Sequence, residues 1–475
     1  MLNPNKRLIL CLDGTWVNSD QGYNRPTLDQ PNATLQIPSN VTRIYRALKK
    51  RDSAGSAQIM YYHPGVGTSG GIADTIAGGL FGAGVSENIR EAYSFVATNY
   101  EPGDEIILVG FSRGAFTARS VAGLITEIGL LTSKGMEFLY PIFKDTLNSR
   151  NPDYKDKFPT VPFKHKPKTP NNGKEYKRRL EEFYDTSLSN GIEYAFQALA
   201  LDEDRPSFAP AVWERPPGVR TDLRQVWFCG AHSNVGGGLP DQELANITMA
   251  WMMDQLNSIG VALEEDTIDR IFEDSLNYYY NCRQEAKPTS ENSKRRRRPE
   301  WAIPSIYYAH RPVRPWGLGE IVDPVTGIYH LAGKTTRTPG MYRYTDHKTG
   351  RPTSEFLENT NERIHRSVRI RLSLEGLGYD DEEPYKCRAL LRKGPWQLKR
   401  TRVMSRRQIE YSYGDEEEIL EQDQGRWGWV YCGPKEDEPP ETLMMEEPLG
   451  PFEDQLLRYS KGRAFYKALL AESQR

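Results

Sequence analysis

Short apolar runs alternate with amphipathic stretches in the first part of the chain. The runs at residues 7–12, 58–62 and 106–109 have the length of buried strands, while residues 40–50, residues 86–100 and the stretch after residue 115 carry apolar side chains at helical spacing. Strands that alternate with helices form parallel sheets covered on both faces, and ligands collect at the carboxyl ends of such strands. The pattern therefore predicts an α/β fold.

The strand predicted at residues 106–109 runs into a serine between two glycines. Gly110, Ser112 and Gly114 form a Gly-x-Ser-x-Gly motif, and an apolar helix without proline follows it. In a nucleophile elbow this motif occupies a strained turn between strand and helix, which lifts the serine Oγ above the sheet. The motif alone also arises by chance in a long chain, but its flanks here favour the elbow. We therefore predict that Ser112 is a nucleophile.

Two more features stand at the ends of predicted strands. The strand at residues 7–12 stops at Asp13, Gly14 and Thr15, and the strand at 58–62 ends in a glycine-rich segment at residues 63–71. Because the carboxyl ends of parallel strands share one edge, we expect these features to form the wall of a site around Ser112. A simple turn at Asp13 is the alternative. The glycine-rich segment lacks the Lys-Ser/Thr of a P-loop, which favours a flexible site wall over phosphate binding.

The middle of the chain breaks this pattern. Residues 143–191 are polar, basic and rich in proline, without an apolar run that could be a central strand. We expect a helix at residues 192–201, a buried strand at 225–229 and an apolar helix at 241–256. Residues 1–260 are thus assigned to one α/β domain. Residues 261–475 are assigned to a C-terminal extension packed on or near it, with a helix at 452–470.

Two histidines are candidates for a catalytic base. His232 follows the strand predicted at 225–229 and precedes three consecutive glycines. A histidine at the end of a buried strand is well placed to take the proton from Ser112. The alternative is a histidine that only holds its loop by hydrogen bonds. His365, which precedes an apolar-alternating stretch, is the second candidate base.

Composition and charge narrow the functional classes. The formal net charge of -2 argues against a nucleic-acid-binding protein, although the run KRRRR, which begins at Lys294 and ends at Arg298, suits nuclear entry or a solvated loop. The five cysteines are odd in number and scattered, which indicates neither a disulfide framework nor a zinc site. The apolar run at the amino terminus is too short for a signal peptide, and no window has the length of a membrane span. We therefore expect a cytoplasmic protein without a metal.

Six segments in a fixed order resemble one family. They are LCLDGTW, YYHPGVGT, GFSRGAFTAR, ALALDEDRPSF, VWFCGAHSNVGGG and ANITMAWMM. They are similar to the α/β-hydrolase-like family that includes the phospholipase effectors of bacterial type VI secretion (the Tle1-like catalytic domain), and particularly to its fungal branch. The resemblance implies an α/β-hydrolase-like fold and a Ser-Asp-His triad that cleaves phospholipid acyl esters without a cofactor. It implies Ser112 as nucleophile, His232 as base, and Gly14, Thr15 and the Arg113 backbone near the oxyanion.

The chain departs from this family at the acid of the triad. Family members carry a strand ending in Trp-Asp-Thr-Val-Gly between the elbow helix and the ALALDE segment, and its aspartate is the expected acid. Nothing here corresponds to it, and a piece is missing between about Glu182 and Phe183. The lack of an apolar run in residues 143–191 points to the same gap. Asp13, Asp202 and Asp204 are the candidate substitutes.

Two functions follow from these observations. The first is a serine hydrolase that acts on carboxylic esters, with phospholipid acyl esters as one substrate class and peripheral contact with a membrane. The second is an impaired or inactive member of the family, such as a splice variant, which acts as a binding protein. A nucleic-acid partner is expected in neither case.

Overall fold

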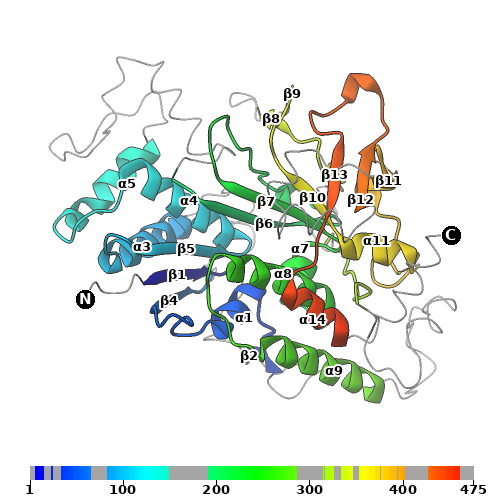
Figure 1. Ribbon diagram of the computed structural model, residues 1–475, viewed down its shortest axis with the longest axis horizontal. Helices are drawn as coiled ribbons and strands as arrows, with labels where there is room; N and C mark the ends of the chain where they lie inside the picture. Colours follow the sequence, from blue (N-terminus) through cyan, green and yellow to red (C-terminus); the bar gives the residue numbers. More distant parts are fainter. Residues whose placement is uncertain are drawn as a thin grey trace. The chain divides into compact units, whose positions relative to one another are not determined.

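The structure is a computed structural model, and it describes residues 6–14, 23–24, 34–65, 83–148, 191–285, 314, 316–325, 333–345, 352–374, 376–392, 394–401 and 426–459. The chain divides into two compact units. Unit 1 comprises Met1–Glu193, Pro216–Thr221 and Gly260–Glu264. Unit 2 comprises Tyr194–Arg215, Asp222–Ile259 and Glu265–Arg475. Each unit is built around a sheet of its own (Figure 1).

The sheet of unit 1 consists of parallel strands in the order β4-β1-β5. Their bounds are β4 Gln58–His63, β1 Arg7–Leu12 and β5 Glu105–Gly110. The central strand β1 is apolar on both faces and is almost fully buried, as expected for a strand with neighbours on both sides and helices above and below. Leu12 pairs with both His63 and Gly110, so the three carboxyl ends are level. The three strands predicted in this region are confirmed.

Helices cover both faces of this sheet. Alternate residues of β1 (Leu8, Leu10 and Leu12) share one apolar core with α3 Ala83–Asn99, α4 Arg113–Ile128 and α5 Leu139–Asn148. The helix α1 Asn40–Ala47 contacts β1 and β4, and the other alternate residues of β1, Ile9 and Cys11, are fully buried as well. A short ladder, β2 Tyr23–Asn24 with β3 Thr34–Leu35, and a 3-10 turn at Gly135–Phe138 complete the described elements of unit 1.

The predicted irregular stretch is partly helical. Its first residues, 143–148, belong to α5, because the apolar side chains of Ile142 and Phe143 are buried against the neighbouring helices. Residues 149–190 lie outside the described residues, and so does the basic run from Lys294 to Arg298.

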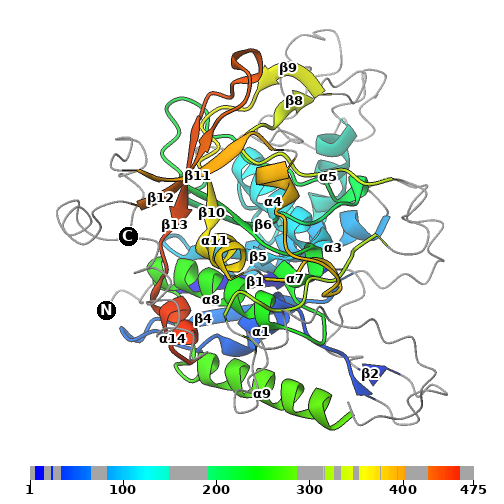
Figure 2. The same cartoon turned by 90° about the vertical axis from the view of Figure 1, so that its right-hand side faces the viewer.

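The sheet of unit 2 is mixed, with the order β11-β12-β13-β10-β7-β6. Its strands are β6 Tyr194–Ala200, β7 Asp222–Phe228, β10 Glu362–His365, β13 Leu443–Glu447, β12 Arg426–Tyr431 and β11 Trp396–Thr401. Pairing is parallel from β6 through β13 and antiparallel between β13, β12 and β11. Figure 2 shows the last three strands side by side. Strands from before and after residue 260 therefore share one sheet.

The helix predicted at residues 192–201 is wrong, because this segment is strand β6. Its sequence, YAFQALA, is rich in residues that favour helices, yet it pairs in parallel with β7 along its whole length. Intrinsic propensities amount to less than about 1 kcal/mol per residue, so ladder hydrogen bonds and packing override them.

The helices of unit 2 follow its strands. Their bounds are α7 His232–Gly236, α8 Glu243–Ser258, α9 Thr267–Glu285, α11 Arg366–Ser373 and α14 Pro451–Tyr459. The terminal helix α14 packs against α8 and α9, and the rest of the helix predicted at 452–470 lies outside the described residues. A small hairpin joins β8 Arg343–Thr345 to β9 Pro352–Phe356. The chain thus has a mixed α/β architecture.

Candidate active site

Ser112 lies in a sharp turn between β5 and α4. Its backbone has φ 56° and ψ -124°, a positive φ that side-chain-bearing residues rarely adopt. The turn is tight: a Cβ on Gly110 would lie 2.5 Å from the Gly114 carbonyl oxygen, and a Cβ on Gly114 would lie 2.0 Å from the Leu12 carbonyl oxygen. Both glycines of the motif are therefore required by contact between backbones. This geometry is that of a strained strand-to-helix turn with a serine at its apex.

The end of β1 approaches the same turn. The Phe111 N–H donates to the Leu12 carbonyl oxygen over 3.2 Å. A Cβ on Gly14 would lie 3.1 Å from the Cβ of Ser112, so only a small residue fits there without displacing the turn. The structure thus brings Gly14 beside Ser112. Thr15, the third residue expected at this position, lies outside the described residues.

Asp13 uses its carboxylate to hold the strand end in place. Its Oδ1 accepts hydrogen bonds from the Gly14 N–H at 2.7 Å and from the Ser39 hydroxyl at 2.8 Å. Its Oδ2 accepts from Thr42 Oγ1 at 2.7 Å and from the Tyr62 hydroxyl at 3.0 Å. The side chain is 3% exposed. Asp13 therefore ties β1 to α1 and β4.

Arg113 is the first residue of α4, directly after Ser112. The first turn of a helix presents backbone N–H groups that have no partner within the helix, and its dipole favours a negative charge. In α4 the Gly114 and Ala115 N–H groups already donate to the carbonyl oxygens of Phe111 and Ser112, over 2.8 and 3.1 Å. An oxygen anion that forms next to Ser112 would lie at the positive end of the dipole of a helix 16 residues long.

A histidine that sequence reasoning did not single out stands at the end of β4. His63 Nε2 lies 2.7 Å from Glu91 Oε2 in α3, and His63 Nδ1 lies 2.7 Å from the Pro64 carbonyl oxygen. Its place at the carboxyl end of a parallel strand was a signal in the sequence. The glycines that follow His63 indicated a flexible site wall, so its ring was not predicted to be a site residue.

His232 lies in unit 2, at the start of α7, four residues beyond the end of β7. Its backbone N–H donates to Glu203 Oε2 over 3.1 Å, and its ring contacts the edge of the Phe208 ring at a centroid distance of 5.0 Å. Burial lowers the pKa of His232 to about 4; Glu203 opposes this shift, while Arg205 and Arg337 add to it. The imidazole is therefore neutral at neutral pH.

The two aspartates proposed as substitute acids flank Glu203 after β6. Asp202 Oδ2 accepts from the Gly230 N–H at 2.7 Å and from the Tyr385 hydroxyl at 3.0 Å. Burial raises its pKa to about 6, although these donors stabilise its charge. Asp204 Oδ2 accepts from the Tyr379 hydroxyl at 3.1 Å, and burial raises its pKa as well.

His365 belongs to the interior of unit 2. The Ser367 N–H and hydroxyl both reach Nδ1, at 3.2 and 2.8 Å, so Nε2 carries the proton and donates to Glu453 Oε1 over 2.7 Å. The residues have the composition of a Ser-His-Glu triad. However, the exposed fractions of His365 and Glu453 are 0% and that of Ser367 is 1%. Substrate cannot reach this set without unfolding, and His365 serves as the N-cap of α11.

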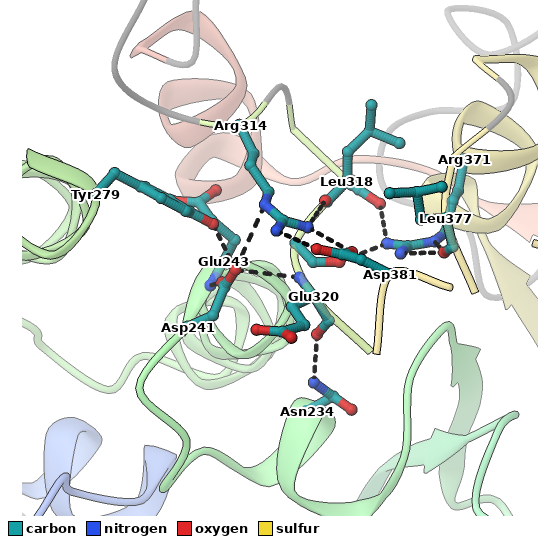
Figure 3. Close-up of polar contacts among 12 residues, drawn as sticks. Asn234, Asp241, Glu243, Tyr279, Arg314, Leu318, Glu320, Arg371, Leu377 and Asp381 are labelled. Carbon is teal, nitrogen blue, oxygen red and sulfur yellow. Dashed lines mark hydrogen bonds and ion pairs between the residues drawn. The ribbon is translucent and has the colours of Figure 1, made fainter. Parts of the chain in front are cut away.

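A network of buried polar groups fixes the loop beside α7 (Figure 3). The Asn234 side chain donates to the Glu320 carbonyl oxygen at 2.8 Å, and the Glu320 N–H donates to Asp241 Oδ2 at 3.1 Å. Arg314 forms a bidentate pair with Asp381, while Arg371 donates to the backbone carbonyl groups of Gly317, Gly319 and Leu377. The hydrogen bond from Asn234 thereby ties α7, which begins at His232, to the loop at Glu320.

Metal-binding side chains and membrane-spanning helices both bear on the class of site. No set of three or more His, Cys, Asp or Glu side chains within the described ranges is arranged to hold a metal ion. None of the helices in that part of the chain combines the length and apolarity needed to cross a membrane.

Comparison with known proteins adds a family and two relatives. The family model described as "T6SS, Phospholipase effector Tle1-like, catalytic domain" matches residues 6–182 and 167–255, more than half of the 475 residues. The Saccharomyces cerevisiae (strain ATCC 204508 / S288c) protein named "Uncharacterized protein YEL023C" is 30% identical over 256 residues, 47% of this chain and 35% of that protein. The match thus spans about a third of the relative's length. A solved structure, "Structure of the Tle1 effector bound to the VgrG spike from the Type 6 secretion system", is similar at a TM-score of 0.27 with 16% identity, over 50% of this chain and 52% of that chain.

Proposed function

Because the chain belongs to the family of type VI secretion phospholipase effectors with a Tle1-like catalytic domain, we propose that it is a serine hydrolase that cleaves carboxylic esters, with phospholipid acyl esters as its substrate class. The observation that carries the proposal is the strained turn at Ser112, with φ 56° between two glycines that admit no Cβ. We assign the catalytic residues to an α/β-hydrolase-like domain within residues 1–260, and the C-terminal extension, residues 261–475, adds the strands β10 to β13 to the sheet of β6 and β7.

The proposed reaction is acyl transfer to Ser112. Its Oγ attacks the acyl carbonyl carbon while its proton passes to His232, and the oxyanion is held by the backbone at Gly14 and Arg113. The Gly14 N–H already donates to Asp13, which counts against it as the oxyanion donor, and the Arg113 backbone in the first turn of α4 is the other candidate. The alcohol leaves with the proton from His232. Water then hydrolyses the acyl ester, returning its proton by the same route.

An impaired enzyme is the second candidate function. The two segments that match the family model overlap at residues 167–182, which supports a break in the domain near the gap expected at Glu182 and Phe183. Among the described strands, β5 precedes the expected gap and β6 follows it, and each lies at an edge of its sheet, where a neighbouring strand is absent. Loss of the orienting aspartate of a Ser-His-Asp triad costs about 10⁴-fold in kcat and leaves residual activity. A slow hydrolase, or a binding protein without turnover, would result.

Labelling of the purified chain with a fluorophosphonate probe tests the nucleophile. Ser112→Ala should abolish labelling, while Ser94→Ala, which removes a hydroxyl that donates to the Arg90 carbonyl oxygen within α3, should leave it intact. A folded protein that the probe does not label would refute hydrolase activity and favour the binding function. Release of fatty acid from phospholipid vesicles, compared with hydrolysis of a short soluble ester, then tests the substrate class.

The pH dependence of labelling tests the base. His232 with a pKa of about 4 is already able to accept a proton in weakly acidic solution, so the rate should change little between about pH 5.5 and 8. A labelling rate that falls as the pH is lowered, with an inflection near pH 6.5, the ordinary pKa of histidine, would contradict the assignment of His232.

A further inference from the structure

The segment after β6 forms a closed set of contacts around His232. Arg205 donates to both carboxylate oxygens of Glu203, from Nε at 2.7 Å and from Nη2 at 2.8 Å, and its own N–H donates to Oε1 at 3.0 Å. The Arg205 guanidinium carbon lies 3.5 Å from the centroid of the Phe208 ring. Phe208 in turn meets the His232 ring, and Glu203 accepts the His232 N–H. The contacts therefore form a closed ring that runs from Glu203 through Arg205, Phe208 and His232 back to Glu203.

Two of these contacts require the Arg205 guanidinium to stay in one place. A bidentate Arg-carboxylate pair fixes both side chains in one plane, and a cation above an aromatic face adds an attraction that depends on the same placement. Arg337 donates from Nη2 to the Arg205 carbonyl oxygen at 2.8 Å and so joins the segment to a distant part of unit 2. Although burial favours the neutral acid, the hydrogen bonds from Arg205 keep the pKa of Glu203 below its ordinary value. Glu203 is thus a buried anion next to the imidazole.

The neighbouring carboxyl groups are placed differently. Asp202 is directed to Gly230 and Tyr385, and Asp204 to Tyr379. Burial raises the pKa of both groups. Glu203 is the member of this trio that directly bonds the residue carrying the candidate base.

We propose that Glu203, clamped by Arg205, is the positioning residue that supports His232 in place of the aspartate missing from the triad. It acts through the backbone N–H and the field at the ring: it holds the first residue of α7 and stabilises the positive charge that the ring acquires when it takes a proton. Arg205 and Arg337 work against that charge, so the support is partial. The inference rests on the proposed function for its catalytic meaning, but the electrostatic link between Glu203 and His232 is measurable without turnover.

The test is the pKa of His232 in the folded full-length chain, followed by NMR of histidine rings labelled with ¹³C, with the signal assigned by its loss in His232→Gln. Glu203→Gln keeps an oxygen that accepts the His232 N–H but removes the charge. It should lower the pKa of His232 by roughly half to one pH unit, as expected for a charge a few ångströms away that is partly neutralised by an arginine. Asp204→Asn, one residue further along, is the matched control and should change it less.

The outcomes separate the inference from the proposed function. If Glu203→Gln leaves the His232 pKa where it is, or moves it no more than Asp204→Asn does, the inference is wrong whatever the activity. If the pKa falls as expected but the wild type does not react with the fluorophosphonate probe, the inference stands and the hydrolase function fails. Should Glu203→Gln not fold, Arg205→Gln serves instead: it removes the hydrogen bonds that keep the buried Glu203 ionised, so the His232 pKa should again fall, and a rise would contradict the inference.

Discussion

Replacement of Gly114 by alanine tests the tight contact between the elbow helix and the central strand. A Cβ at this position would lie 2.0 Å from the Leu12 carbonyl oxygen and 2.6 Å from that of Asp13. Real carbon-oxygen contacts are not shorter than about 3 Å, so α4 would have to move away from β1 by about 1 Å. Both obstructing atoms are backbone carbonyl oxygens, in the last residue of β1 and in the residue after it, so they cannot rotate aside as side-chain atoms can. We expect Gly114→Ala to destabilise this region by about 3 kcal/mol, at the upper end for an overpacked core.

Gly123→Ala in the same helix is the matched control. A Cβ there would have no atom within 4 Å. Alanine in place of an unhindered helical glycine stabilises by about 0.5 to 1 kcal/mol, because it loses less backbone freedom on folding. The same chemical change at two places in α4 should therefore act in opposite directions.

Hydrogen exchange measured by mass spectrometry on peptides from β1 and α4 is the suitable assay, because a chain of two compact units has no single unfolding free energy. A loss of about 3 kcal/mol corresponds to exchange on the order of 100-fold faster in Gly114→Ala, whereas Gly123→Ala should exchange at the wild-type rate or more slowly. If the two variants exchange alike, the close approach of α4 to β1 is wrong, and with it the geometry of the elbow.

Three further predictions concern strain, a buried anion and pH. Ser112→Gly should be more stable than Ser112→Ala by about 1 kcal/mol, because glycine adopts φ 56° without strain; equal exchange rates in α4 would show that the turn is relaxed. Asp13→Asn should destabilise unit 1 by about 2 to 4 kcal/mol in the same assay, because the amide NH2 replaces an oxygen that accepts either from the Gly14 N–H or from Thr42 and Tyr62, whereas Tyr62→Phe should cost only about 1 kcal/mol. Burial lowers the pKa of His365 to about 3, so its contribution to the stability of the folded state is complete above pH 6.5 and is lost as the pH falls toward 3. From pH 6.5 to about pH 4, wild-type unit 2 should lose on the order of 3 kcal/mol more stability than His365→Gln, as measured by hydrogen exchange of peptides from unit 2 at each pH and corrected for the intrinsic exchange rate; parallel losses would refute the linkage.

The elements around Ser112 follow from local sequence. The run at residues 7–12 is apolar throughout, and an apolar run of that length between polar flanks has few options other than a strand buried on both faces. The glycines at 110 and 114 stand two residues from the serine because the turn leaves no space for a Cβ at either place. Strand, turn and helix are all determined within about 25 residues, which is why the sequence was sufficient here.

Segment 192–201 shows where local information was not enough. Ala, Leu and Gln favour a helix when considered alone, but the segment became a strand because β7 offers a parallel partner along its whole length. His365 is a similar case: it was a candidate base because it precedes an apolar-alternating stretch, while its burial against Phe228 and its bond to Glu453 depend on residues that are distant in the chain.

The sequence by itself determined the class of fold, the elbow at Ser112 and the family, because each rests on spacing between residues that are close in the chain. Tertiary structure decided which groups each carboxylate contacts. Asp13 is occupied by Ser39, Thr42 and Tyr62, whereas Glu203 is brought to His232, 29 positions away, by the parallel pairing of β6 and β7. Contacts between charged groups depend on a few ångströms, and these distances exist only once the strands have paired.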